Sequence, residues 1–186
     1  MNRRELLKLI AVATGLPLIG ADILTAAENA ARPAGGAHVF TPEEIRFLDE
    51  VAETIIPRTS TPGAKDAEVG AFMAVYAADC YTDEQRTLFL SAISDIEKRS
   101  QAEHGKAFVD LTAEQRQALL SVLDKQAKAE QSPAKPHAFT LVKQLTLLGF
   151  FTSKIGATEV FVYDEIPGGF EDRVPYKKGT PAWGTT

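Results

Sequence analysis

Three short motifs that start helices recur along the chain, and they constrain its fold more than any other feature. Each begins with a threonine and places Glu or Gln three residues later, in Thr41–Glu44, Thr82–Gln85 and Thr112–Gln115. In such a capping box, the threonine hydroxyl and the Glu or Gln side chain each accept a hydrogen bond from a backbone N–H group at the helix start. Because apolar residues at helical spacing follow each motif, the sequence predicts three helices from these positions.

Two further helices are predicted from apolar spacing and from helix-ending residues. A helix from about Ala67 to Tyr81 is indicated by residues that share one face: Val69, Phe72, Met73, Tyr76 and Cys80. A helix from about His137 to Lys154 is apolar around most of its circumference, which is typical of a helix at the centre of a core or covered by a partner. Pro57 and Gly105 are expected to end the first and third helices. We therefore expect an all-α bundle of about five helices over residues 41–155.

The C-terminal tail, residues 156–186, differs from the bundle in composition. It is rich in proline and glycine, and aromatic residues are interleaved with them. Exposed aromatic side chains would leave apolar surface in water, so we expect this extended tail to lie along the bundle or along another chain. Tyr and Trp are common at the centres of protein interfaces. The residues proposed as a partner interface are Phe150, Phe151, Tyr163, Phe170, Tyr176 and Trp183.

The first residues have the layout of an export signal. Arg3, Arg4 and Lys8 form a positive start, an apolar stretch follows, and small residues dominate the end of the segment. The arginine pair resembles a twin-arginine signal, the type that exports folded proteins. We expect residues 1–31 to be this signal, residues 32–40 a linker, and the periplasm the destination. Pro17 and Asp22 interrupt the apolar stretch, so retention as a membrane anchor is the less favoured alternative.

Composition excludes several functions and points to no catalytic chemistry. Apolar residues make up 45% of the chain, as in globular proteins, and the net charge of −5 without a long basic run argues against nucleic-acid binding. Cys80 is the single cysteine and is expected in the core, although an intermolecular disulfide remains an alternative. The three histidines have no second ligand at metal-binding spacing. No catalytic, cofactor-binding or metal-binding residue is therefore assigned.

Two segments of the chain carry a resemblance to a known family. The run Phe40–Glu44 and the following Glu53–Ala64, which reads Glu-Thr-Ile-Ile-Pro-Arg-Thr-Ser-Thr-Pro-Gly-Ala, look like the gluconate 2-dehydrogenase subunit 3 family. Residues Gly149–Ala157 and the tail from Tyr163 to Pro175 are similar to the C-terminal part of that family. The family often has a cysteine before this proline, whereas here Val174 precedes Pro175. The resemblance thus implies no tail disulfide.

The resemblance implies a non-catalytic small subunit of a periplasmic sugar or sugar-acid dehydrogenase. In such complexes a large subunit of the glucose–methanol–choline type binds FAD and oxidises the substrate. A third subunit, where present, is a cytochrome that carries c-type haem. The small subunit carries the signal read by the twin-arginine translocase and is needed for maturation and export of the large subunit, so no cofactor is expected in this chain. An independent exported binding or structural helical protein is the alternative interpretation.

Overall fold

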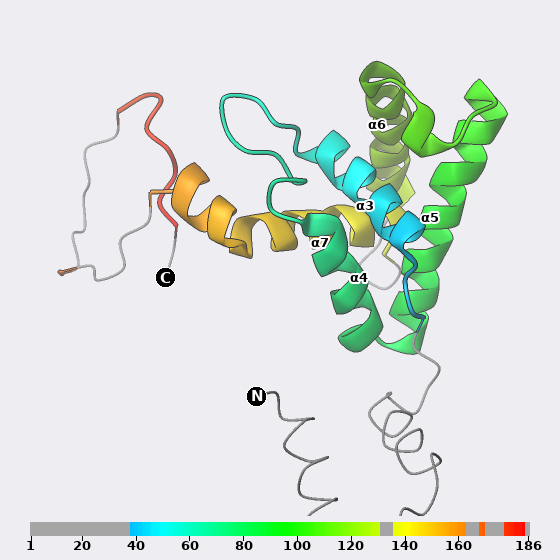
Figure 1. The fold of residues 1–186 in the computed structure, drawn as a ribbon, viewed down its shortest axis with the longest axis horizontal. Coiled ribbons are helices and arrows are strands. Elements are labelled where there is room, and N and C mark those ends of the chain that lie inside the picture. Colours follow the sequence, from blue (N-terminus) through cyan, green and yellow to red (C-terminus); the bar gives the residue numbers. More distant parts are fainter. Residues whose placement is uncertain (1–37, 131–135, 163–167, 170–176, 185–186) are drawn as a thin grey trace, which may run out of the picture. The chain divides into compact units, whose positions relative to one another are not determined.

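The computed structural model describes residues 38–130, 136–162, 168–169 and 177–184, and the described residues from Val39 onward belong to one compact unit (Figure 1). The described residues form helices and no strand, so the predicted all-α fold is confirmed. The predicted signal over residues 1–31 lies outside the described residues. The helices are α3 (Pro42–Ile55), α4 (Val69–Asp79), α5 (Asp83–His104), α6 (Ala113–Glu130) and α7 (Ala138–Thr152), with a 3₁₀ turn, η1 (Phe108–Asp110), and a π-helical turn, η2 (Gly156–Val160).

The helix starts follow the predicted capping boxes. At α3, the backbone N–H of Thr41 donates to Glu44 Oε2 at 2.8 Å, and the N–H of Glu44 donates to Thr41 Oγ1 at 3.2 Å. The same reciprocal pair of bonds forms at Thr82 before α5 and at Thr112 before α6. Gly105 ends α5 with φ +65°, a left-handed conformation that glycine adopts without steric cost. These predictions are confirmed. They could be made from the sequence because a capping box and a helix-ending glycine depend only on residues that are close together in the chain.

Helix α7 is the central helix of the bundle. It contacts α3, α4, α5 and α6 (Figure 1), and its inner face is buried. Gly149 allows the close approach of α4, because a Cβ atom there would lie 2.6 Å from Cδ1 of Phe72. The buried residues of α7 are Phe139, Leu141, Val142, Leu145, Thr146, Gly149 and Phe150.

Helix α4 differs from its prediction at both ends. It begins at Val69, after Glu68 takes a left-handed conformation with φ 51°, and it ends at Asp79. Cys80 therefore caps the helix instead of lying on its inner face, and it is exposed. The expectation of a buried Cys80 is wrong. The next residue, Tyr81, packs against the rings of Tyr76 and Phe89, and its burial, together with nearby Tyr76, raises the pKa of its hydroxyl to about 12.

The described part of the tail is more structured than expected. Gly156–Val160 form the π-helical turn η2 instead of an extended segment, and a Cβ at Gly156 would collide with the carbonyl of Phe150. Beyond this turn, Val162 and Trp183 form a parallel β-bridge. The N–H of Val162 donates to Ala182 O, and the N–H of Gly184 donates to Val162 O, both at 2.9 Å. Residues 182–184 are therefore hydrogen-bonded to Val162, which follows η2.

Candidate partner-binding surface

The outer face of α7 carries apolar side chains that the bundle does not cover. Leu147, Leu148 and Phe151 are 37%, 41% and 37% exposed, and we call these residues the outer stripe. They are spaced by one and three residues, which places them on one side of the helix, opposite buried Val142 and Gly149. A helix with apolar residues on both its inner and outer faces is typical of one that also contacts another chain.

Aromatic residues extend this apolar surface beyond the end of α7. The ring of Phe151 stacks on Phe161, with a centroid distance of 5.0 Å and an interplanar angle of 26°. The next residue, Val162, holds the backbone of Trp183 through the β-bridge, and the Trp183 side chain is 56% exposed. Residues far apart in sequence thus bring exposed apolar groups to the C-terminal end of α7. Exposed clusters that contain Trp and Phe side chains are common at protein interfaces.

The predicted interface residues fall into three groups. Phe150 is 2% exposed and packs in the chain's own core, so it offers almost no surface to a partner. Phe151 and Trp183 are exposed, as a contact role requires. Leu147 and Leu148 were not singled out from the sequence, although the apolar circumference of this helix contained the signal. The remaining candidates, Tyr163, Phe170 and Tyr176, and the signal residues Arg3 and Arg4 lie outside the described residues.

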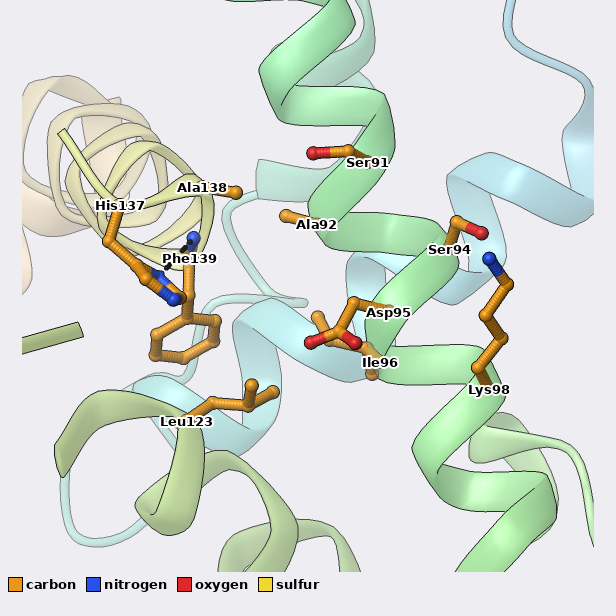
Figure 2. Close-up of a pocket in the computed structure, with 10 residues that line it drawn as sticks. All are labelled: Ser91, Ala92, Ser94, Asp95, Ile96, Lys98, Leu123, His137, Ala138 and Phe139. Atoms are coloured by element: carbon orange, nitrogen blue, oxygen red, sulfur yellow. Dashed lines mark hydrogen bonds between the residues drawn. The ribbon is translucent and has the colours of Figure 1, made fainter. Parts of the chain in front are cut away.

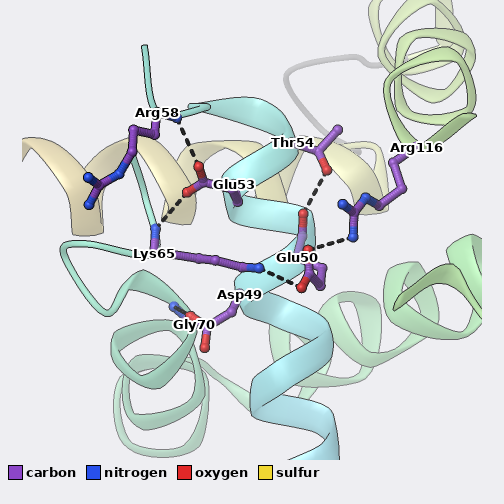
Figure 3. Close-up of polar contacts among 8 residues, drawn as sticks. All are labelled: Asp49, Glu50, Glu53, Thr54, Arg58, Lys65, Gly70 and Arg116. Carbon is purple, nitrogen blue, oxygen red and sulfur yellow. Dashed lines mark hydrogen bonds and ion pairs between the residues drawn. The ribbon is translucent and has the colours of Figure 1, made fainter. Parts of the chain in front are cut away.

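A second ordered feature is the loop between α3 and α4, which carboxylates hold in place (Figure 3). Glu53 of α3 accepts hydrogen bonds from two backbone N–H groups of this loop, Arg58 at 2.8 Å and Lys65 at 2.9 Å. Asp66 accepts the N–H of Gly63 at 2.8 Å and binds the guanidinium of Arg58. That guanidinium holds the pKa of Asp66 below its usual value, with a further contribution from the Gly63 N–H. The loop is therefore fixed by side chains at several points along its length.

Neighbouring acidic residues of α3 tie this loop to two other helices. Glu50 binds Lys65 Nζ and the Arg116 guanidinium of α6, both at 2.5 Å (Figure 3). Asp49 Oδ1 accepts the N–H of Gly70 in α4 at 2.9 Å. Burial raises the pKa of Asp49, and the Gly70 N–H offsets part of this shift. The charges of this cluster are paired with groups of the protein itself, which indicates a structural role.

A cavity of about 360 Å³ lies between α5, α6 and the start of α7 (Figure 2). Its lining mixes polar groups, among them Asp95, with apolar Leu123 and Phe139. Asp95 already binds Arg99 Nε at 2.8 Å, and His137 Nδ1 accepts the N–H of Phe139 at 3.2 Å, as the cap of α7. Ser91 of the lining donates to Leu88 O at 2.7 Å, and among the described residues no hydrogen bond joins Ser91 or Ser94 to Asp95 or His137.

No group of three or more His, Cys, Asp or Glu residues in the described part of the chain is placed to hold a metal ion. In the same part of the chain, none of the helices is long and apolar enough to cross a membrane.

The fold and its surface define a class of protein: a small all-α protein with an apolar stripe on the outside of its central helix. The family model of gluconate 2-dehydrogenase subunit 3 matches residues 42–168, which include all five described α-helices. The chain belongs to this family, and the resemblance seen in the sequence is confirmed. Searches of curated proteins and of solved structures found no significant match.

Proposed function

We propose that this chain is the non-catalytic small subunit of a periplasmic FAD-dependent sugar or sugar-acid dehydrogenase. Its role is to bind the catalytic flavoprotein and to support that subunit's maturation and export. The family is described as a subunit of a dehydrogenase, which supports an accessory place in such a complex. FAD belongs to the large subunit in this proposal, and c-type haem to a cytochrome where the complex includes one.

The observation that carries the proposal is the outer stripe on α7. Leu147, Leu148 and Phe151 each expose more than a third of their surface, although they lie on the helix that organises the core. Covering these side chains with a partner removes apolar area from water, which favours binding by about 25 cal/mol per Å² before the costs of association. A subunit that remains bound through export needs a large interface, on the order of 2,000 Å² or more. The outer stripe is proposed as the apolar centre of that interface.

The export part of the proposal rests on the N-terminal sequence. Arg3 and Arg4 head a segment that resembles a twin-arginine signal, and the twin-arginine translocase carries folded proteins. A flavoprotein that folds around FAD before export can cross the membrane attached to a subunit that carries this signal. One signal then serves both chains, and the complex reaches the periplasm assembled.

The binding claim is tested with the full chain, tagged and co-expressed with its gene neighbours. A Leu147→Gln/Leu148→Gln variant should capture at least about tenfold less of the co-purifying subunit than the wild type, because polar groups replace the apolar centre. Val122→Gln is the control, since Val122 is 47% exposed and belongs to a different helix, α6. Equal capture by the stripe variant and the wild type would contradict the proposed interface.

The export claim has a separate test in the same strain. Arg3→Lys/Arg4→Lys should keep both the chain and its partner in the cytoplasm, whereas the wild type delivers both to the periplasm. Fractionation followed by immunoblotting of both subunits measures this. Arrival of the partner in the periplasm with the double lysine variant would show that it is exported independently of this chain.

A further inference from the structure

The cavity between α5, α6 and the start of α7 has no part in the surface proposed for the partner. It lies at the N-terminal end of α7, whereas the outer stripe lies in the C-terminal half of that helix. Its volume of about 360 Å³ falls within the range of small-molecule sites, ~300–1,000 Å³. Buried apolar side chains form part of its lining: Ala92, Ile96, Leu123 and Phe139. Such walls fit an apolar ring and disfavour a charged group that lacks a partner.

Asp95 brings a hydrogen-bond acceptor to this lining. Figure 2 shows its carboxylate extending from α5 toward the side on which His137 and Phe139 lie, whereas Lys98 extends from the other side of α5. The Oδ2 atom of Asp95 accepts a hydrogen bond from Arg99 Nε at 2.8 Å. The Oδ1 atom makes no hydrogen bond to another described residue, so it can accept one from a ligand.

His137 brings a hydrogen-bond donor to the same cavity. Its Nδ1 atom accepts the N–H of Phe139 at 3.2 Å, so in the neutral ring the proton is on Nε2. The Nε2 atom lies 3.8 Å from Glu130 Oε2, which is beyond the length of a hydrogen bond. This N–H therefore has no hydrogen-bond acceptor among the described residues, although the His137 side chain is only 21% exposed. Polar groups in such positions usually have a partner, from the protein or from a bound molecule.

We propose that this cavity binds a small uncharged aromatic ring that carries a carboxamide or hydroxyl group. The ring packs on the apolar lining, and its polar group accepts a hydrogen bond from His137 Nε2 and donates one to Asp95 Oδ1. A carboxylate on the same ring has no proton to donate and brings a second negative charge to Asp95, so it is disfavoured. The inference is independent of the proposed function, because the cavity and the outer stripe share no residue.

Benzamide and benzoate are matched probes for this site, because they share one ring and differ only in the polar group. The full chain, labelled at its isoleucine and leucine methyl groups, is titrated with each probe and followed by NMR. Benzamide should shift the methyl signals of Ile96 and Leu123 with a dissociation constant of about 10 mM or below. Benzoate should bind at least about tenfold more weakly. Shifts that do not saturate, or equal affinity for the two probes, would overturn the proposal.

Variants of the full chain examine the two polar groups. Asp95→Ala should weaken the binding of benzamide by about threefold or more, because it removes the acceptor. Asp83→Ala is the matched control and should bind benzamide as the wild type does, since Asp83 is another ion-paired aspartate of α5 but does not line the cavity. Equal binding by the two variants would contradict the role of Asp95.

His137→Ser keeps a side-chain oxygen that can cap α7 and removes the Nε2 donor. It should weaken benzamide binding by about threefold or more, with a nearly unchanged melting temperature. Benzamide binding equal to that of the wild type would contradict the role of His137. Asp95→Ala should also capture the co-purifying subunit as well as the wild type does. Loss of that capture would show that a side chain of the subunit, and not a small molecule, occupies the cavity.

Discussion

Single side chains decide how the segment between α3 and α4 is built. Glu53 replaces the missing backbone partners of two loop N–H groups, and Asp49 does the same for Gly70 at the second residue of α4. Groups that are left without a partner in such positions cost about 1–3 kcal/mol each. At this scale, the fold explains three acidic residues of α3: Asp49, Glu50 and Glu53.

Gly63 is predicted to tolerate no side chain. In Gly63→Ala the new Cβ meets Arg58 N and the Glu53 carboxylate at 2.5 and 2.6 Å, so the loop base must shift. We expect a loss of about 1–3 kcal/mol in the free energy of unfolding, measured by urea denaturation. Gly168→Ala is the control, because nothing lies within 4 Å of its Cβ position. Equal stability of the two variants would contradict the close packing at Gly63.

Asp49 is predicted to stabilise the fold as a hydrogen-bond acceptor and not through its charge. Burial raises the pKa of the Asp49 carboxyl in the folded protein. The stability that this pKa shift contributes is fully present below the pKa of Asp49 in the unfolded state, and it is lost as the pH rises through the pKa of Asp49 in the folded state. Asp49→Asn keeps an acceptor for the Gly70 N–H and has no charge to bury. We expect this variant to be at least as stable as the wild type at pH 7, with a smaller dependence of stability on acid pH.

Asp49→Ala serves as the control for that prediction, because it removes the acceptor and leaves the Gly70 N–H without its partner. It should lose about 1–3 kcal/mol at pH 7 in the same urea measurement. If the asparagine and alanine variants lost the same stability, the acceptor role of Asp49 would be wrong.

At the scale of elements, α7 has two different apolar faces. Its inner face packs against the other α-helices of the unit, and its outer face carries the outer stripe. One face is explained by folding, and the other is explained in our proposal by binding. Neighbouring positions of the same helix therefore have different expected consequences when they are changed.

Leu145 and Leu148 separate these two roles. Leu145 is 2% exposed, so Leu145→Ala should lower the free energy of unfolding by about 2–5 kcal/mol. Leu148 is 41% exposed, so Leu148→Gln should change stability by less than about 0.5 kcal/mol and should act on partner binding. Thermal unfolding of the free chain measures both. Equal destabilisation by the two changes would mean that the outer stripe is part of the core.

Some features of these elements could be predicted from the sequence, and others could not. The starts of α3, α5 and α6 could be predicted because a capping box uses residues only three apart. The fastening of Trp183 to Val162 could not, because a single β-bridge between distant residues leaves no periodic pattern. The same limit applied to Phe150 and Leu148: both are apolar residues of one helix, and only the position of its neighbours determines which of them is buried.

At the scale of the whole molecule, the features described so far fit a protein that completes its surface with a partner. The core is formed within the chain, and four of the seven large exposed apolar side chains of the described residues lie on the outer face of α7 or follow its C-terminal end: Leu147, Leu148, Phe151 and Trp183. Family membership places the chain with a dehydrogenase subunit, and the sequence of residues 1–31 supplies the proposed route to the periplasm. Binding, and not catalysis, is the central claim of this account.

The most direct test of that claim is the absorption spectrum of the wild-type chain purified by its tag from the periplasm, after co-expression with its gene neighbours. The account predicts a yellow complex that shows the absorption bands of flavin and contains a second subunit of flavoprotein size by mass spectrometry. A colourless chain that is purified alone and remains soluble would contradict it, and would favour an independent exported binding or structural protein.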